Sequence, residues 1–237
     1  MNLQVFLMIA SLSTAIALPI SIRMSFADKV SQSLKVKPLE QVENNLLSLK
    51  QKQTDVKLIL KTKKCNGCNL SYINLSGADL TGADFRNADL SYANLTNTIL
   101  QDAKMSGARL NNANLKNADL AGADFKNSNL KSADLSEAQM MNTSLINADF
   151  TAAILKSSEL RDADLTGAKL ANANLSNASL YGTHLNDTNL TGTNLSNTNL
   201  RYANLSTAIL KNTNLSGADL NLAIMPQEMT KYGTAQY

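Results

Sequence analysis

The chain has 237 residues, of which 44% are hydrophobic, 5% aromatic and 17% charged, and its formal net charge is +3. This near-neutral balance excludes a polyanion. The chain holds two cysteines and a single histidine, His184, which lies more than a hundred residues from both cysteines. These three side chains do not make a metal-ligand set of the kind that zinc requires.

Residues 1–27 are the first predicted element, a secretory signal peptide. Residues 5–22 are apolar and uncharged, and residues 25–27 (Ser-Phe-Ala) have the small-x-small pattern of a cleavage site. No basic residue precedes the apolar stretch, whereas Arg23 and several lysines follow it. That asymmetry favours the opposite orientation, an uncleaved anchor with the rest of the chain in the cytoplasm. We prefer cleaved export, with the membrane-anchored or cytoplasmic form as the alternative.

Residues 28–64 are predicted to be a helical N-terminal segment. Its apolar side chains follow helical spacing at Leu39, Val42, Leu46 and Leu49. Thr54 and Asp55 resemble a helix start, so a second helix is expected to follow and to cap the repeats after it. Residues 1–69 carry 10 basic and 4 acidic residues. This excess fits contact with an anionic membrane surface or, more simply, a solvated helix face.

Residues 65–225 repeat with a period of five. Every fifth residue from Leu70 to Met225 is Leu, Phe or Met, and these 32 central positions never change phase. A fixed period is the signature of a solenoid, and five matches neither an α-helix nor a long strand. The residue two before each centre is small: 21 Ala, 7 Thr, 2 Ser, Cys68 and Ile73. Two residues at this spacing share one face of a short extended segment.

The remaining positions of each repeat are predicted to turn the chain. Gly or Asn fills 19 of the 31 positions that lie two residues after a centre, from Tyr72 to Leu222. These two residue types tolerate the positive φ that a tight turn needs. Each pentad is therefore expected to be a short strand followed by a corner.

Two of these pentads carry a resemblance to a known family. Residues 78–82 (Ala-Asp-Leu-Thr-Gly) and 173–177 (Ala-Asn-Leu-Ser-Asn) resemble the A(D/N)LXX unit of pentapeptide-repeat proteins. The resemblance covers residues 65–225 and implies an all-β solenoid, a right-handed four-sided parallel β-helix with 20 residues per coil. Thirty-two pentads would make about eight coils. Residues twenty apart then become neighbours, so Phe85, Met105 and Phe125 are expected to stack in a core that leaves no room for a ligand.

Cys65 and Cys68 fall at a centre and at a small inward position, so both thiols are expected to point into the first coil. A structural disulfide fits an exported chain. Buried free thiols and a redox role are the alternatives, and a lone CxxC without a thioredoxin-like pattern is weak support for redox chemistry. Residues 62–70 also resemble the lead-in of exported cyanobacterial and thylakoid-lumen pentapeptide-repeat proteins.

The outer faces offer the candidate binding residues. At steps of twenty, the position after the centre gives one line, a possible partner-binding ladder of Met141, Arg161, Tyr181 and Arg201. Tyr and Arg are favoured at interaction hot spots. A chance column that only stabilises itself is the alternative interpretation. Tyr72 and Tyr92 are aligned in the same way near the N-terminal end.

No motif indicates catalysis or a cofactor. The recurring Asp residues occupy one outward position of the repeat, as does His184, and no phosphate loop, nucleophile elbow or zinc-protease motif occurs. The sequence therefore predicts a non-enzymatic scaffold or protein-binding module in the thylakoid lumen or periplasm. Some members of the family mimic duplex DNA, which carries about one charge per 1.7 Å. The net charge of −3 over residues 70–225 disfavours DNA mimicry and nucleic-acid binding.

Residues 226–237 are the last predicted element, a short polar tail that begins at Pro226. The tail supplies no second helical cap. The final coil is therefore a candidate for end-to-end association with a second copy of the chain.

Overall fold

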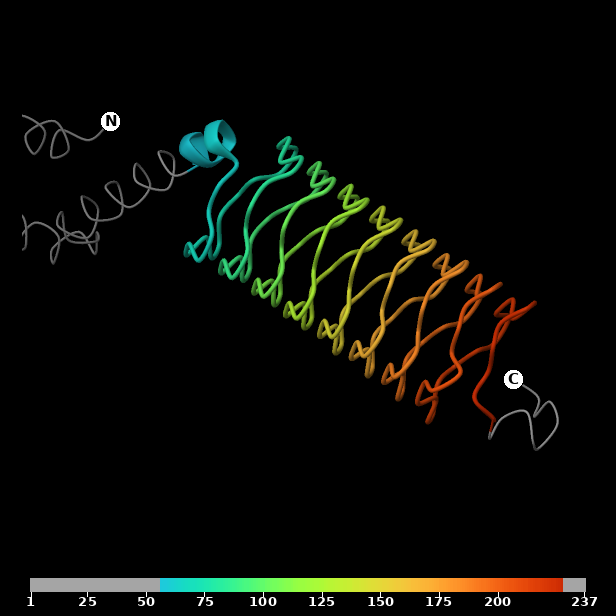
Figure 1. Cartoon of the computed structure of the whole chain (residues 1–237). Helices are drawn as coiled ribbons and strands as arrows, with labels where there is room; N and C mark the ends of the chain where they lie inside the picture. The colour runs from blue at the N-terminus through green and yellow to red at the C-terminus, as the bar shows by residue number, and fades with distance from the viewer. Residues whose placement is uncertain (1–55, 228–237) are drawn as a thin grey trace, which may run out of the picture. The chain divides into compact units, whose positions relative to one another are not determined.

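The computed structural model describes residues 56–227. Two of the predicted elements, the signal peptide at 1–27 and most of the helical segment at 28–64, lie outside the described residues, as do residues 228–237 of the tail. The described part is a short helix followed by stacked coils (Figure 1), in which the chain progresses from one end of a rod to the other.

The coils are held together by parallel β-bridges, and every bridge joins residues twenty apart. Bridging residues recur every five positions from Lys64 to Ile224, so the 160 residues between them make eight coils with four sides each. At the bridge between Arg109 and Asn129, Leu110 N donates to Asn129 O over 2.7 Å and Asn129 N donates to Ala108 O over 2.9 Å. The twenty-residue coil that the resemblance implied is confirmed. Each side is so short that a single residue makes the bridge, in place of the short strand expected from the sequence.

Each corner is a tight turn closed by a backbone hydrogen bond. Ala113 N, for example, donates to the carbonyl oxygen of Leu110 over 3.0 Å. The second corner residue has a positive φ at every described corner from Gly67 to Leu222 except Thr207. Thr207 is also the β-branched residue at this position, and β-branched residues rarely adopt positive φ. Its corner differs accordingly: Asp187 N donates to Thr207 Oγ1 over 2.8 Å.

The residue before a centre is most often Asp or Asn, and the side chain of such a residue supports the corner. Asn114 Oδ1 accepts a hydrogen bond from Lys116 N over 3.1 Å, and Asp134 Oδ1 accepts from Ser136 N over 2.9 Å. Such Asx turns satisfy a backbone donor that the corner would otherwise leave to water. The recurring acidic residues therefore have a structural role.

The core is a continuous shaft of central and small side chains. Phe85, Met105 and Phe125, which share one column, are all fully buried. The large residues of the last coil are less well covered, since Leu210, Leu220 and Met225 are only partly buried. The C-terminal end of the core is therefore the more open part of the described shaft.

A helix over residues 56–62 lies at the N-terminal end of the rod (Figure 1), where the sequence predicts the second helix. Ile59 is only 2% exposed and belongs to the core, and Val56 packs against the same core. Lys63 ends the helix with a φ of 51°, and its N–H donates to Ile59 O over 2.7 Å. A left-handed residue at this position is a common way to terminate a helix.

Candidate protein-binding surface

The most distinctive surface feature is a group of three side chains on one corner of the rod, Arg161, Tyr181 and Tyr202, which we call the corner cluster. Arg161 Cζ lies 5.9 Å from the ring centroid of Tyr181. The rings of Tyr181 and Tyr202 have centroids 5.2 Å apart and are inclined at 58°. Tyr202 is 47% exposed, so the cluster presents aromatic surface to solvent. Aromatic rings and guanidinium groups in contact are typical anchors of protein interfaces.

The predicted ladder of Met141, Arg161, Tyr181 and Arg201 is brought together only in part. All four occupy one column at steps of twenty, but the contact within it is between Arg161 and Tyr181. On the other side of Tyr181 the neighbouring ring belongs to Tyr202, one position beyond Arg201. The Arg201 side chain is exposed, and its backbone N–H donates to Asn199 Oδ1 over 3.2 Å.

Tyr202 was not predicted, because the ladder contains only residues in the same position of the repeat and Tyr202 occupies the next one. The signal that could have found it is a diagonal spacing of 21 residues, which joins adjacent corner positions of successive coils. Tyr202 has a φ of 60°, and this left-handed backbone sets the direction in which its side chain leaves the corner. Alignment at steps of twenty cannot represent that change of direction.

The Arg161 side chain is also held by its own coil. Arg161 Nη2 lies 3.8 Å from Glu159 Oε2, while the backbone N–H of Arg161 donates to Glu159 Oε1 over 3.1 Å. Glu159 thus accepts the same corner hydrogen bond that Asp or Asn accepts in other repeats, but with a longer side chain. An exposed ion pair of this kind contributes little stability but restrains the guanidinium beside Tyr181.

Apolar surface continues from the corner cluster to the last coil. Leu222 follows Tyr202 by twenty residues and is 66% exposed, and Ile224 on the adjoining side is also exposed. These two exposed apolar residues lie in the coil that follows Tyr202. This combination differs from the Asn, Ser and Thr residues that cover most of the C-terminal coils.

A second aromatic pair lies near the N-terminal end. The rings of Tyr72 and Tyr92 stack with centroids 4.8 Å apart and planes within 2°. Both side chains are exposed, as expected for aligned outward residues. No arginine contacts this pair among the described residues. The pair is therefore a natural control for the corner cluster, because it has the same ring type on the same backbone without the cation.

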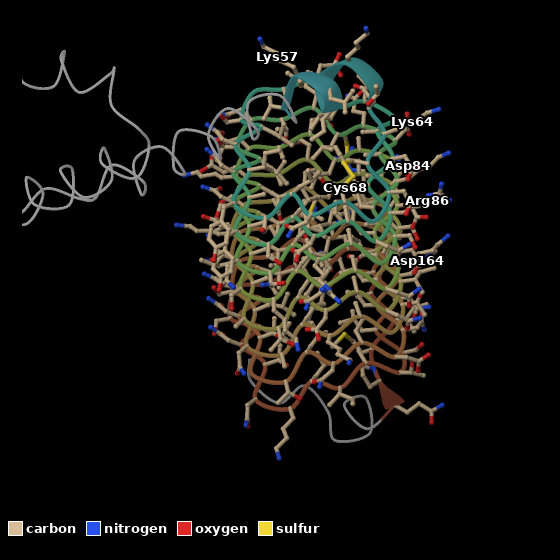
Figure 2. The ribbon with its side chains drawn as sticks, turned by 90° about the vertical axis from the view of Figure 1, so that its left-hand side faces the viewer. Lys57, Lys64, Cys68, Asp84, Arg86 and Asp164 are labelled. Carbon is tan, nitrogen blue, oxygen red and sulfur yellow. A yellow bond between two sulfur atoms is a disulfide. The ribbon has the colours of Figure 1, made fainter. Side chains whose placement is uncertain are left out.

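Cys65 and Cys68 form a disulfide in the structure, with their Cα atoms 5.3 Å apart. Figure 2 shows the bond at Cys68, just below the N-terminal helix. Both residues are partly buried and pack against the core. The backbone of the pair is already tied into the next coil, because Cys65 N donates to Asp84 O and Asp89 N donates to Cys68 O. The disulfide thus closes the first corner of the solenoid.

Several acidic side chains have lowered pKa values because they accept hydrogen bonds at corners. The backbone N–H of Thr81 contributes most to lowering the pKa of Asp79 to about 2. The side chain of Arg86 does the same for Asp84, whose pKa is also about 2, through bonds of 2.8 and 2.7 Å (Figure 2). These values arise from single corners and not from paired carboxylates, so they do not indicate an acid–base pair.

His184, the single histidine of the chain, lies on the outside of the rod. His184 is exposed and bridges to Asp164 and Asn204 through its backbone, as expected for an outward position of the repeat. Over residues 56–227, no group of three or more His, Cys, Asp or Glu side chains is placed to hold a metal ion. Within the same range, no helix has the length and apolar character needed to span a membrane.

Comparison with known proteins identifies the repeat. The family model for pentapeptide repeats matches in eight copies, over residues 64–102, 108–145, 118–156, 158–197 and 188–225. No protein with curated annotation matches the chain. Among solved structures, HetL, a pentapeptide repeat protein involved in heterocyst differentiation regulation from the cyanobacterium Nostoc sp., is 30% identical. The match covers 73% of this chain and 96% of HetL, with a TM-score of 0.51.

Two further solved structures illustrate the range of similar proteins. A pentapeptide repeat protein from the thylakoid lumen of Arabidopsis thaliana is 30% identical over 52% of this chain and 68% of its own, with a TM-score of 0.22. QnrB1, a plasmid-mediated fluoroquinolone resistance protein, is 20% identical over 71% of this chain and 94% of its own, with a TM-score of 0.40.

Proposed function

This chain belongs to the pentapeptide-repeat family, and on that premise we propose that it is an exported, non-catalytic scaffold that binds a protein partner through the corner cluster. The observation that carries the proposal is the contact of Arg161 with Tyr181 and of Tyr181 with Tyr202 on an exposed corner. Most other outward positions near the cluster are small polar residues that serve the turns. The corner does not require aromatic or arginine side chains, because asparagine or serine would support it equally well, whereas both residue types are enriched at protein interfaces.

The proposed partner surface is small and pre-formed. Arg161 is restrained by Glu159, and Tyr181 is held between the guanidinium and the second ring. Rigid side chains lose little conformational entropy on binding. The nearby Leu222 and Ile224 extend the apolar contact area toward the last coil. HetL, which resembles this chain over most of its length, takes part in regulation, and a binding scaffold is compatible with such a role.

Export to the thylakoid lumen or periplasm forms part of the proposal. The apolar residues 5–22 and the small-x-small pattern at 25–27 support cleavage after Ala27. The Cys65–Cys68 disulfide is compatible with an oxidising compartment. In this proposal the helix at 56–62 caps the first coil, because Ile59 covers the end of the core. Intact mass of the protein from its native cell, with and without alkylation, tests both cleavage and the disulfide.

The open C-terminal end supports self-association as a further part of the proposal. Leu220 and Met225 are only partly buried, and the last coil has no following coil to accept its backbone hydrogen bonds within the described residues. Unpaired edges of this kind favour pairing with another chain. Light scattering over a range of concentrations should show a dimer, and a monomer at the highest concentration would contradict this part.

Binding through the corner cluster is tested with two matched double variants. Tyr181→Ser/Tyr202→Ser removes the two rings of the cluster, whereas Tyr72→Ser/Tyr92→Ser removes the stacked pair elsewhere. Each form is used to isolate binding proteins from the soluble exported fraction of the native cell, and the affinity of any retained protein is then measured with purified components. We expect the first variant to weaken binding at least tenfold and the second to leave it unchanged.

Other results would overturn the proposal. Equal binding by all three forms would show that the corner cluster is not the interface. Loss of binding in the Tyr72→Ser/Tyr92→Ser variant alone would assign the interface to the other aromatic pair. Circular dichroism and thermal unfolding of each variant establish that the rod is intact, because all four rings lie on the surface and their removal is not expected to disturb the core.

A further inference from the structure

The N-terminal end of the rod carries an uncompensated positive charge. Between Val56 and Ala78 the sequence has four lysines and no acidic residue. One of them, Lys63, pairs with Asp79 over 3.1 Å. The other three, Lys57, Lys61 and Lys64, are exposed and make no ion pair with the described residues. Asp84 bridges to Lys64 through the backbone, but its carboxylate is engaged by Arg86.

The helix at 56–62 directs this charge away from the rod. Ile59 faces the core. Lys57 and Lys61 are each two positions from Ile59, a rotation of about 200°, and therefore lie on the opposite side of the helix. Figure 2 shows Lys57 pointing outward from the end of the rod. The N-terminal end of the rod therefore presents a basic surface to the solvent.

Apolar side chains accompany the lysines on the same short helix. Leu58 is 58% exposed and Leu60 is 42% exposed, one on each flank of the helix. Exposing two leucines on one short helix in water contributes nothing to the stability of the rod. Lysines alone would suit any polyanion, including a nucleic acid or an acidic protein. Lysines flanked by exposed leucines match an anionic lipid surface, which offers both phosphate groups and an apolar layer.

The preceding chain supports the same partner. Residues 5–22, proposed above to be a signal peptide, would bring the chain to a membrane during its synthesis, and residues 23–55 hold six basic and four acidic residues. We propose that the N-terminal end of the rod binds an anionic lipid bilayer through Lys57, Lys61 and Lys64, with Leu58 and Leu60 entering the headgroup region. This surface is separate from the corner cluster and does not depend on it.

The proposed orientation gives the solenoid a mechanical purpose. Tyr181 lies six coils beyond Lys61 in the sequence, and coils are separated by roughly 4.8 Å. A rod held by its N-terminal end would therefore present the corner cluster about 30 Å from the headgroups. The open C-terminal end would face away from the bilayer. The length of the rod would then set the distance at which a partner is held.

Binding to lipid vesicles tests the proposal. Sedimentation is measured with vesicles of phosphatidylcholine alone and with vesicles containing about one-third phosphatidylglycerol, at low and high salt. The full chain and the chain starting at Asp28 are both used. The shorter form lacks the apolar stretch but retains the unit that begins at Val56. We expect both to bind the anionic vesicles, with affinity that falls as salt rises.

Two charge variants separate this surface from a general electrostatic effect. K57Q/K61Q/K64Q removes the three end lysines, whereas K104Q/K126Q/K156Q removes three exposed lysines from the middle of the rod that also make no ion pair. In the chain starting at Asp28, K57Q/K61Q/K64Q should weaken binding to anionic vesicles by roughly a hundredfold. K104Q/K126Q/K156Q should weaken it by less than about threefold. L58S/L60S should weaken binding while leaving its salt dependence unchanged.

Three outcomes would overturn the proposal. If the chain starting at Asp28 binds no vesicles, the apolar stretch is the whole of the membrane contact. If both lysine variants lose affinity equally, the effect is one of net charge. If K57Q/K61Q/K64Q binds as before and thermal unfolding shows an intact rod, the end surface is excluded directly.

Discussion

The coils over residues 70–164 and those over residues 165–225 share one backbone but differ in chemistry. The first region has 20 charged residues among 95, whereas the second has 5 among 61 and is rich in Asn, Ser and Thr. Inside, the small position is mostly Ala in the first region, but Thr183, Thr188, Thr193 and Thr198 fill a complete coil of the second. The fold therefore constrains the size and spacing of side chains much more tightly than their polarity.

The threonines show why the core tolerates this change. Thr188 Oγ1 donates to Leu185 O over 2.6 Å, and Thr98 in the first region makes the same bond to Leu95 O over 2.7 Å. In three of the four threonines of that coil, the hydroxyl donates to a carbonyl oxygen three residues earlier. Thr193 Oγ1 instead donates to Leu170 O in the preceding coil over 2.7 Å. Burying this hydroxyl has little cost, because its hydrogen bond is retained. On the surface, few charged side chains surround Arg201 in the second region, whereas Arg161 in the first region pairs with Glu159.

The largest expected effect distinguishes the interior of the rod from its open end. Leu115→Ala removes a fully buried side chain and should lower the free energy of unfolding by about 2–5 kcal/mol. Leu220→Ala, in the partly exposed last coil, should cost roughly half of that or less, because the site is already near solvent. Urea unfolding measures both. Equal losses would mean that the last coil is covered as well as the interior.

The corner glycines test whether the two regions share one corner geometry. A methyl group added at Gly107 would lie 2.5 Å from Asn87 Oδ1, and one at Gly192 would lie 2.6 Å from Asn172 Oδ1. Gly77 has the same positive φ but open space around it. Gly77→Ala should cost about 1–2 kcal/mol for the backbone alone. Gly107→Ala and Gly192→Ala should each cost about 1 kcal/mol more, because an amide must move.

A double variant isolates that steric contribution. Asn87→Ala/Gly107→Ala removes the obstructing amide, so the added cost of the Gly107 substitution should fall to the value found for Gly77→Ala. Thermal unfolding of the single and double variants gives the comparison. A Gly77→Ala cost equal to that of Gly107→Ala would show that the stacking of Asn over Gly between coils contributes nothing.

The third prediction concerns the small inward residue, which is mostly Ala in the first region and often Thr in the second. Ala108→Thr should change stability by less than about 1 kcal/mol, because the added hydroxyl can donate to the carbonyl oxygen of Met105 as Thr98 does to Leu95. Thr188→Val keeps the shape of the side chain but loses the bond to Leu185 O, and should cost about 1 kcal/mol. Denaturation midpoints measure both. A loss above about 3 kcal/mol for Ala108→Thr would show that the first region is packed too tightly for threonine.

The period of five was sufficient to predict the core and the corners, because each depends on local rules repeated without interruption. The coil length of twenty residues came from the family resemblance and not from the period. The frequent Asp and Asn residues before the centres were visible as a pattern in the sequence. Their cause, the hydrogen bond from a backbone N–H two residues later, became clear only from the structure. Gly107 and Gly192 each follow an Asn by twenty residues. This spacing already indicated that the glycine lies against the Asn side chain of the preceding coil.

Contacts that cross from one column to the next could not be predicted in this way. The approach of Tyr202 to Tyr181 depends on the direction of a side chain at positive φ, which a one-dimensional register does not encode. The altered corner at Thr207 is an intermediate case. Its β-branched side chain marked a departure from the preferred Gly and Asn, but the new hydrogen bond from Asp187 N was not foreseeable from the period.

The smallest expected effect concerns acid and should separate the two regions again. The carboxyl groups with lowered pKa values in the described residues, Asp79, Asp84, Asp89 and Asp149, all belong to the first region. A carboxyl with a lowered folded pKa stabilises the protein above its ordinary value of 3.8, and that contribution is lost as pH falls through the folded value. For Asp79 and Asp84 the loss should occur between about pH 4 and pH 2.

Hydrogen exchange resolves where in the rod this loss occurs. On moving from about pH 5 to about pH 2.5, amides in the coils near Asp79 and Asp84 should lose more protection than those of residues 165–225, after correction for the intrinsic rate. D79N/D84N retains side-chain acceptors for the corner bonds but does not titrate, so the pH dependence of its N-terminal coils should be smaller. Uniform loss along the rod would mean that coils unfold together and that the charge difference between the regions has no local effect on stability.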